Sequence, residues 1–208
     1  MAGFSGNVTI RSQSDNLNGL SGKVTASAMY GRITDDAVRP IQIDDSTHAI
    51  KTIEYEHSEI HAGDHYNYCD YQLANALNDT IEFVMTTPNT TKWIHLSLET
   101  YSSQGCEIEL YEGASGITDG TSITPRNNNR NSANTSGVTL VKDPSAITSD
   151  GTRAAGFLAG AGRNAGFINR DREYVLKQNT IYLVRITSVA NSNDIAWCAE
   201  WYEHTNKN

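Results

Sequence analysis

The sequence predicts an all-β protein folded as a two-sheet antiparallel β-sandwich, similar in layout to a jelly roll. Apolar and polar residues alternate with a period of two over short stretches, and clusters of Asn, Gly, Pro and Asp separate these stretches. Ten Tyr, sixteen Gly and many Thr, Ser and Asn residues suit strands and turns. A sustained helical period appears nowhere. About eight strands at this spacing fit a sandwich.

The alternation assigns the strands one by one. Residues 38–43 and 47–55 flank the turn residues 44–46 and predict a hairpin. The other predicted strands are 65–73, 81–85, 93–98, 106–110, 138–141, 173–176, 181–189 and 195–201. The side chains expected to face the core are Ile81, Phe83, Met85, Ile94, Leu96, Leu98, Cys106, Ile108, Leu110, Ile195, Trp197, Ala199 and Trp201.

Composition changes along the chain predict its organisation. Residues 1–37 are rich in Gly, Ser and Asn and have no sustained period, so they are expected to form an N-terminal arm or appendage. Residues 38–208 are expected to form the sandwich, with long loops at 111–137 and 144–169.

The loop at 111–137 is the first candidate for a functional surface. Asparagine tolerates left-handed backbone and bonds its own main chain, so a run of Asn favours a bent, internally hydrogen-bonded loop. A solvated insertion without function is the alternative. Arginine is favoured at interfaces, and the residues expected to contact another subunit or a capsid are Arg126, Asn127, Asn128, Asn129, Arg130 and Asn131.

A second candidate surface is a histidine-rich segment. His57, His61 and His65 are spaced four apart, with Glu59 between them. On a strand, these four side chains would share one face. A metal site is one interpretation, but we favour polar contacts at a subunit interface, where histidine protonation would make assembly sensitive to pH. We expect no metal and no other cofactor.

Charge and hydropathy exclude several classes of partner. The formal net charge of -8 argues against binding a nucleic-acid backbone, and no apolar run has the length of a membrane helix. The charge is uneven: residues 35–64 contain eight acidic and two basic side chains, whereas 126–172 contain seven basic and three acidic ones. Such asymmetry can orient two copies, or one copy and a capsid; solvated charge on opposite faces explains it equally well.

The three cysteines, Cys69, Cys106 and Cys198, are widely spaced and form no CxxC pair. The sequence therefore indicates neither a zinc site nor a redox motif, and buried free thiols are expected.

Catalytic motifs are weak throughout, and we expect no enzyme. The pairs Glu54/Glu56 and Glu107/Glu109 have the alternation of solvent-facing strand residues, which explains them better than a glycosidase site does. Tryptophans and tyrosines can stack on sugar rings, but the position of Trp197 and Trp201 on an apolar stripe favours the core.

Taken together, several segments make the chain resemble tailed-bacteriophage virion structural proteins of the head-decoration (cement) or head-fibre type. These segments are VRPIQIDDSTHAI, IEYEHSEIHAGDHY, TTPNTTKW, LYEGASG, TPRNNNRNSANTSG, VLKQNTIYL and WYEHT, and they run from about Val38 to Thr205. The resemblance implies a β-sandwich on the outer surface of a capsid or on a fibre. It also implies an arm that attaches the protein to the particle or threads between copies.

The expected function is therefore that of a decoration protein made in the host cytoplasm and carried on the outer surface of the head. It would bind the major capsid protein as a homo-oligomer, expected to be a trimer, and stabilise the shell by bridging capsid subunits. The alternative is a receptor-binding sandwich of a fibre or tail that recognises host surface glycan, because one fold serves many functions. No nucleic acid and no membrane are expected as partners.

Overall fold

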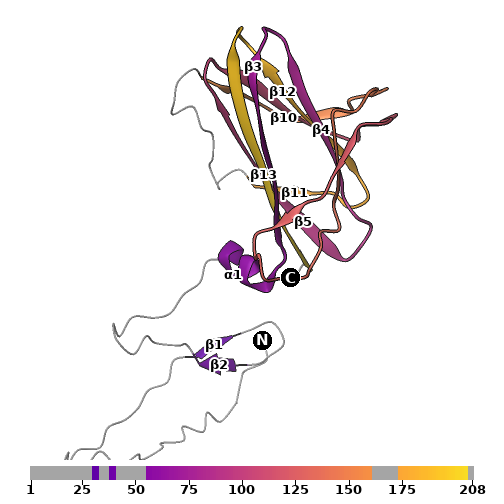
Figure 1. The fold of residues 1–208 in the computed structure, drawn as a ribbon. Coiled ribbons are helices and arrows are strands. Elements are labelled where there is room, and N and C mark those ends of the chain that lie inside the picture. Colours follow the sequence, from indigo (N-terminus) through magenta and orange to yellow (C-terminus); the bar gives the residue numbers. More distant parts are fainter. Residues whose placement is uncertain (1–29, 33–37, 41–54, 161–172, 206–208) are drawn as a thin grey trace, which may run out of the picture. The chain divides into compact units, whose positions relative to one another are not determined.

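A computed structural model describes residues 30–32, 38–40, 55–160 and 173–205 of the chain (Figure 1). The chain divides into two compact units, with the boundary between Thr52 and Ile53. In the first unit, β1 (Tyr30–Arg32) pairs with β2 (Val38–Pro40) in antiparallel register. Val38–Pro40 pairs with a preceding strand, and Tyr55, the last residue of the predicted hairpin, begins a helix instead of ending a strand. The remainder of that hairpin, and most of the expected arm, lie outside the described residues.

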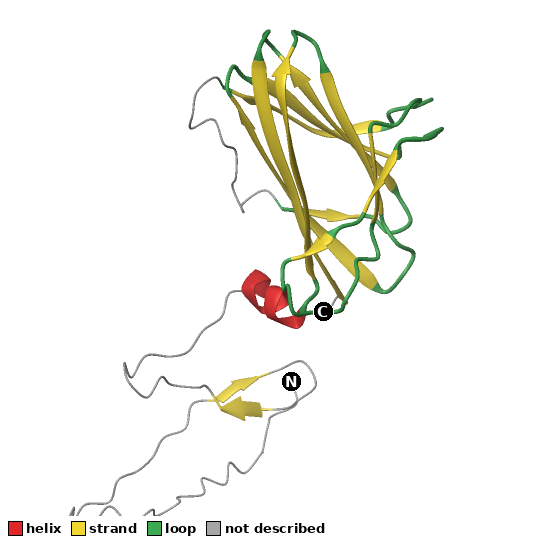
Figure 2. Ribbon diagram, viewed as in Figure 1, coloured by secondary structure: helices red, strands yellow, loops and turns green. Residues whose placement is uncertain are grey.

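The second unit is a two-sheet antiparallel β-sandwich, which confirms the predicted fold class (Figure 2). A short helix, α1 (Tyr55–Ala62), precedes it. The six-stranded sheet has the order β10 (Thr152–Ala159), β6 (Cys106–Glu112), β12 (Ile181–Ser188), β4 (Thr80–Thr86), β9 (Thr139–Lys142), β7 (Thr121–Ile123). The five-stranded sheet has the order β11 (Tyr174–Leu176), β5 (Lys92–Ser102), β13 (Asn193–Thr205), β3 (His65–Asn75), β8 (Arg126–Asn127).

The strands from β3 to β6 alternate between the two sheets. β3 and β5 belong to the five-stranded sheet, whereas β4 and β6 belong to the six-stranded one, and β12 and β13 are divided in the same way. Each of these connections therefore crosses an end of the sandwich instead of forming a hairpin, whereas β6, β10 and β12 all lie in the six-stranded sheet. Every long strand is paired with a strand distant in sequence, so the loops at both ends hold the two sheets together.

The core lies between the sheets and follows the predicted alternation. On β13, Ile195, Trp197, Ala199 and Trp201 are buried, and the intervening side chains face outward. The other predicted core residues are also buried, except Leu98, which is half-buried against the same cluster. Burying an aliphatic or aromatic side chain contributes about 1.5–3 kcal/mol each, so this cluster is the main source of stability.

The two expected long loops are more structured than the sequence indicates. The first contains β7 and β8, which pair with the edges of different sheets. The second contains β10, an eight-residue strand paired with β6, so the loop prediction for 152–159 is wrong. This stretch is rich in Gly and Ala, and an edge strand needs few large side chains because backbone hydrogen bonds hold it. The two excursions also pair with each other through Ser115–Ser149 and Thr118–Ala146 bridges.

The paired excursions cover part of the outer face of the six-stranded sheet. Val84 and Leu183 point away from the main core, yet they are buried in a second cluster with Ala114. Arg185 fixes this cover by donating to both oxygens of Asp150 at 2.7 and 2.9 Å. The central strands β4 and β12 are therefore apolar on both faces.

Two of the three cysteines do not match the expectation of free thiols. Cys69 and Cys198 face each other on β3 and β13, on the outer face of the five-stranded sheet, and form a disulfide. Cys106 is free and fully buried, as expected, and its burial raises the pKa of its thiol to about 11.

The buried side chain of Asn193 holds together one end of the sandwich. Its Oδ1 accepts hydrogen bonds from Ser102 Oγ at 2.8 Å and from the backbone N–H of Gln104 at 2.9 Å. Its Nδ2 donates to the carbonyl of Gly105 at 2.7 Å and to Ser188 Oγ at 3.0 Å. One amide thus joins the β5–β6 connection to the β12–β13 connection.

Replacing Asn193 with Ala is expected to lower the free energy of unfolding by about 3–5 kcal/mol, because it leaves several buried donors and acceptors without partners. Urea denaturation followed by tryptophan fluorescence measures the change. Asn131→Ala, at an exposed position, is the control and is expected to change stability by less than about 0.5 kcal/mol. Equal stabilities for the two variants would contradict the assigned role of Asn193.

Reducing the Cys69–Cys198 disulfide is expected to destabilise the sandwich by about 2–4 kcal/mol, because the bond closes a long loop in the unfolded chain. Denaturation with and without dithiothreitol measures the loss. The double variant Cys69→Ala/Cys198→Ala, which retains Cys106, should be insensitive to the reductant. An unchanged midpoint for the fully reduced wild type would show that the bond does not contribute.

Candidate functional sites

The structure brings the two predicted surfaces together at one end of the sandwich. We call this region the α1–loop corner: it consists of α1 and residues 126–137. β8, at the start of the loop, pairs with β3 through Asn127 opposite Tyr66 and Arg126 opposite Asn67. Residues about 65 positions apart in sequence therefore share a surface. From the sequence, the loop and the histidine-rich segment were predicted as two separate surfaces.

Three of the predicted interface asparagines hold the loop in place. Asn127 Nδ2 donates to the carbonyl of Gly63 at 2.8 Å, and Asn129 Nδ2 donates to the carbonyl of His61 at 3.1 Å. Asn128 contacts His65 Nδ1 at 2.7 Å. Within the loop, Asn127 Oδ1 accepts the backbone N–H of Asn129 at 2.8 Å, which is the local bonding expected of an Asn-rich turn.

The predicted arginines remain on the surface of this ordered loop. Arg126 and Arg130 are both exposed, as is Asn131. Arg130 Nη1 donates to the carbonyl of Asn127 at 3.3 Å, which leaves other donors of its guanidinium facing solvent. The loop therefore presents two cationic, donor-rich groups from a fixed backbone.

A buried carboxylate fastens the far end of the loop. Glu203 on β13 is 3% exposed and accepts hydrogen bonds from the backbone N–H of Gly137 at 3.0 Å and from Trp201 Nε1 at 3.2 Å. Ser136 Oγ donates to the same carboxylate. Glu203 was not predicted as a functional residue, although it continues the buried stripe of β13, which was a usable signal.

The histidines do not share a strand face, so that prediction is wrong. Residues 55–62 form α1, which places His57 and His61 one turn apart, with their Nε2 atoms separated by 3.0 Å. His65 lies on β3, is 2% exposed and stacks near Tyr202. A glycine with positive φ, Gly63, ends the helix between them. Among the described residues no group of three or more His, Cys, Asp or Glu side chains is arranged to hold a metal ion.

A second polar cluster, missed in the sequence, lies beside the corner. On the outer face of the five-stranded sheet, His204 Nε2 is 2.7 Å from His95 Nε2, and Tyr202 donates its hydroxyl hydrogen to Glu173 at 2.6 Å. His95 forms an ion pair with Glu173. These residues come from β5, β13 and the start of β11, and no local pattern in the sequence indicates that these strands are neighbours.

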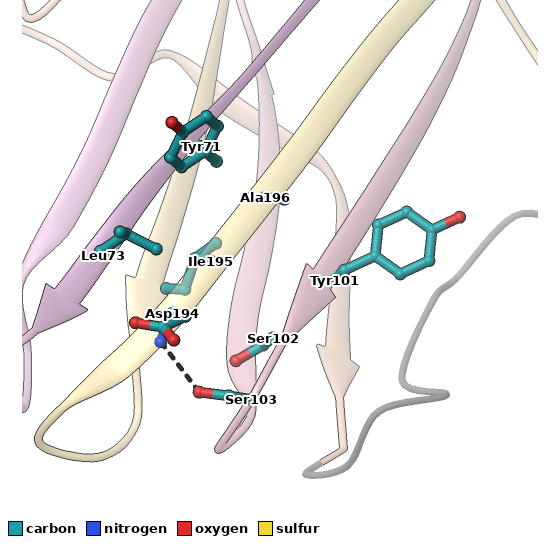
Figure 3. Close-up of a pocket in the computed structure, with 8 residues that line it drawn as sticks. All are labelled: Tyr71, Leu73, Tyr101, Ser102, Ser103, Asp194, Ile195 and Ala196. Atoms are coloured by element: carbon teal, nitrogen blue, oxygen red, sulfur yellow. Dashed lines mark hydrogen bonds between the residues drawn. The ribbon is translucent and has the colours of Figure 1, made fainter.

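The opposite end of the same sheet face carries an open groove of about 360 Å³ (Figure 3). Tyr71 on β3 and Tyr101 on β5 lie opposite Ala196 on β13, one on each side. Asp194 and Ser103 close one end, where the backbone N–H of Asp194 donates to Ser103 Oγ at 2.9 Å. From the sequence, the tyrosines were considered only as a group. The alternation within each strand places Tyr71 and Tyr101 on the outer face, and this would have singled them out.

Other candidates from the sequence do not assemble into a site. Trp197 and Trp201 are buried in the core. Glu107 and Glu109 lie on one face of β6, and Glu109 accepts a hydrogen bond from the exposed Arg153 at 3.0 Å. The side chains of Glu54 and Glu56 lie outside the described residues.

Replacing His204 with Gln is expected to reduce the loss of stability on acidification. Burial, and then the charge of His95, lower the pKa of His204 in the fold, whereas Glu59 and Glu173 act in the opposite direction. In the unfolded chain, a histidine side chain has a pKa of about 6.5. The contribution of His204 is therefore complete above this pH and is lost as the pH falls through it toward the lower, folded pKa.

Urea denaturation at several pH values between about 5 and 7.5 measures this effect. The control is Asn131→Ala, at an exposed position without a titratable group, which should follow the wild-type profile. An identical profile for His204→Gln and wild type would contradict the assignment. His65 and Tyr202 also border this cluster. The comparison requires that their hydrogen bonds remain intact in the variant.

Comparison with known proteins adds no identification. No protein-family model, curated protein or solved structure matches this chain. In the part of the chain that the structure describes, none of the helical segments has the length and apolarity needed to cross a membrane.

Proposed function

We propose that this chain is a capsid-decoration protein that binds the outer surface of a bacteriophage head and bridges its subunits. The observation that supports this most is the α1–loop corner: an ordered loop, fastened by asparagines and by Glu203, that holds Arg126 and Arg130 exposed. A fixed loop does not have to be ordered on binding, so little conformational entropy is lost in forming a contact.

Arginine suits such a contact because its planar guanidinium offers several donors to carboxylates and carbonyls. Both cations belong to residues 126–172, the basic stretch of a chain whose net charge is -8. An acidic partner surface, on the capsid or on another copy, would be complementary to them. The homotrimeric state and the major capsid protein as partner are supported by the resemblance to cement proteins.

The mechanism would be one of binding linkage. A protein that binds the assembled shell in preference to free subunits stabilises the shell by mass action. Many equivalent sites on a shell make modest individual affinities sufficient, and a second attachment point in the same chain raises the effective concentration. The unit formed by residues 1–52 precedes the sandwich in the chain and would provide that second attachment.

The double variant Arg126→Ala/Arg130→Ala is expected to bind decoration-free heads about tenfold or more weakly, because interface arginines are frequent hot spots. Co-sedimentation with such heads across a salt series gives the affinity and the number of copies bound. The control is Arg153→Ala, an exposed arginine on the other sheet. Light scattering reports the oligomeric state of each variant, and circular dichroism reports the fold.

Equal, saturable binding by wild type and the double variant would remove the loop from the interface. Failure of the wild type to pellet with heads at all would refute the decoration function. Repeating the binding between about pH 5.5 and 8 tests the corner histidines, because their protonation should change the affinity if they belong to the interface.

A further inference from the structure

The groove at the other end of the five-stranded sheet is not explained by core packing. It also lies away from the surface proposed to bind the capsid. Tyr71 is 65% exposed and Tyr101 is 44% exposed, although both are large and partly apolar. They belong to one row across three strands, with the small side chain of Ala196 in the middle. The row is thus high, low and high, which leaves a slot above Ala196 with Tyr71 on one side and Tyr101, whose ring is turned outward, on the other (Figure 3).

The dimensions of the slot suit a single six-membered ring. Strands in a sheet lie about 4.8 Å apart, so the two tyrosines start from backbones about 9–10 Å apart. A ring stacked against an aromatic side chain needs about 3.5–4 Å on each side. The space above Ala196 therefore has room for one six-membered ring, whereas a bulkier side chain at position 196 would fill it.

The polar groups lie at the ends and rim of the slot, not on its floor. Asp194 and Ser103 are at one end. At the other end, Tyr101 donates its hydroxyl hydrogen to Glu99 at 3.4 Å. A ligand with apolar faces and a hydroxylated edge would match this distribution, because its C–H groups would pack on the rings and its hydroxyls would reach carboxylates and serine.

The charge around the slot restricts the ligand further. Asp194, Glu99 and Glu200 all lie on this sheet face. Burial, and then the charge of Glu200, raise the pKa of Glu99, so the two carboxylates already disfavour each other's charge. An anionic ligand would add to this repulsion. The nearby Asp70 is already paired with Lys142 at 2.9 Å.

The same charges disfavour a second copy of the chain as the occupant. An isologous contact centred on Ala196 would bring Asp194, Glu99 and Glu200 close to the same residues of the partner. Like charges juxtaposed at an interface cost several kcal/mol. The exposed Leu73 beside Tyr71 extends the apolar wall without altering this balance.

We propose that the groove between Tyr71 and Tyr101, above Ala196, binds one pyranose ring of an uncharged glycan. Carboxylates at the edge of the ring would accept hydrogen bonds from its hydroxyls, and the tyrosines would enclose its C–H faces. The site does not depend on the α1–loop corner, since the two regions lie at opposite ends of the sheet. Glycan binding and capsid binding can therefore fail independently.

Affinity gel electrophoresis of the full chain tests this inference. The gels contain neutral polysaccharides (α- and β-glucans, galactan and mannan), with polygalacturonate as the acidic comparison. Retardation by at least one neutral polymer is expected, together with about tenfold weaker binding for Tyr71→Ala and for Tyr101→Ala. Ala196→Phe should abolish retardation by filling the slot. Leu158→Ala, which removes an exposed side chain from the other sheet, should bind like wild type.

Three results would overturn the proposal. One is no retardation by any neutral polymer, and another is retardation by polygalacturonate alone. The third is retardation that persists in Tyr71→Ala, Tyr101→Ala and Ala196→Phe. Light scattering on the same variants separates the sugar site from a protein interface: a lower oligomeric state in the tyrosine variants, without any glycan effect, would assign the groove to contact between copies.

Discussion

The buried amide of Asn193 is the contact on which one end of the sandwich depends. Because the strands from β3 to β6, and β12 and β13, alternate between the sheets, no tight hairpin joins them. The connections that cross the ends must do so, and they contain backbone groups that need partners away from water. Asn193 supplies these partners at one end, and the carboxylate of Glu203 does so at the other. Apolar packing between the ends makes the two sheets adhere, while these polar side chains determine how they align.

This arrangement separates two surfaces on one rigid body. The α1–loop corner lies where the chain enters and leaves the sandwich, since Tyr202 near the end of β13 is opposite His65 at the start of β3. The groove lies six residues further back along β13, which is about 20 Å in a strand. A particle protein held at the corner would thus present its groove away from the site of attachment. Such a division would allow attachment and glycan recognition to change separately through substitution.

The sequence was sufficient for the fold class and for most of the core, because a period of two specifies which side chains face inward regardless of which strand lies next to which. It was insufficient wherever pairing mattered. The disulfide requires Cys69 and Cys198 to be opposite each other across β3 and β13, and the groove requires Tyr71, Ala196 and Tyr101 in one row. These are long-range registers that local alternation does not contain. The helix over 55–62 was missed because its polar residues show no amphipathic period, and β10 was missed because an edge strand needs few bulky residues.

The corner was anticipated more fully, because asparagine has a local mechanism for bending and fastening a loop. Arg126 and Arg130 are exposed as that mechanism predicts, whereas Asn127, Asn128 and Asn129 hold the loop in place from within. The division of labour between the two residue types follows from tertiary contacts with Gly63, His61 and His65, which no local pattern specifies.

The position of the disulfide has a consequence for how the protein would respond to mechanical load. A force applied to the chain before β3 and after β13 acts on these two strands, which are antiparallel neighbours. It would separate their residue pairs one at a time, from the end near Thr205. Separation stops at Cys69–Cys198, because that bond is covalent. The 129 positions between the cysteines, about 450 Å of extended chain, are thereby shielded from tension. The groove and the core residues between the two cysteines would stay folded, while the segments outside the bond, which carry Tyr66 and Trp201, extend.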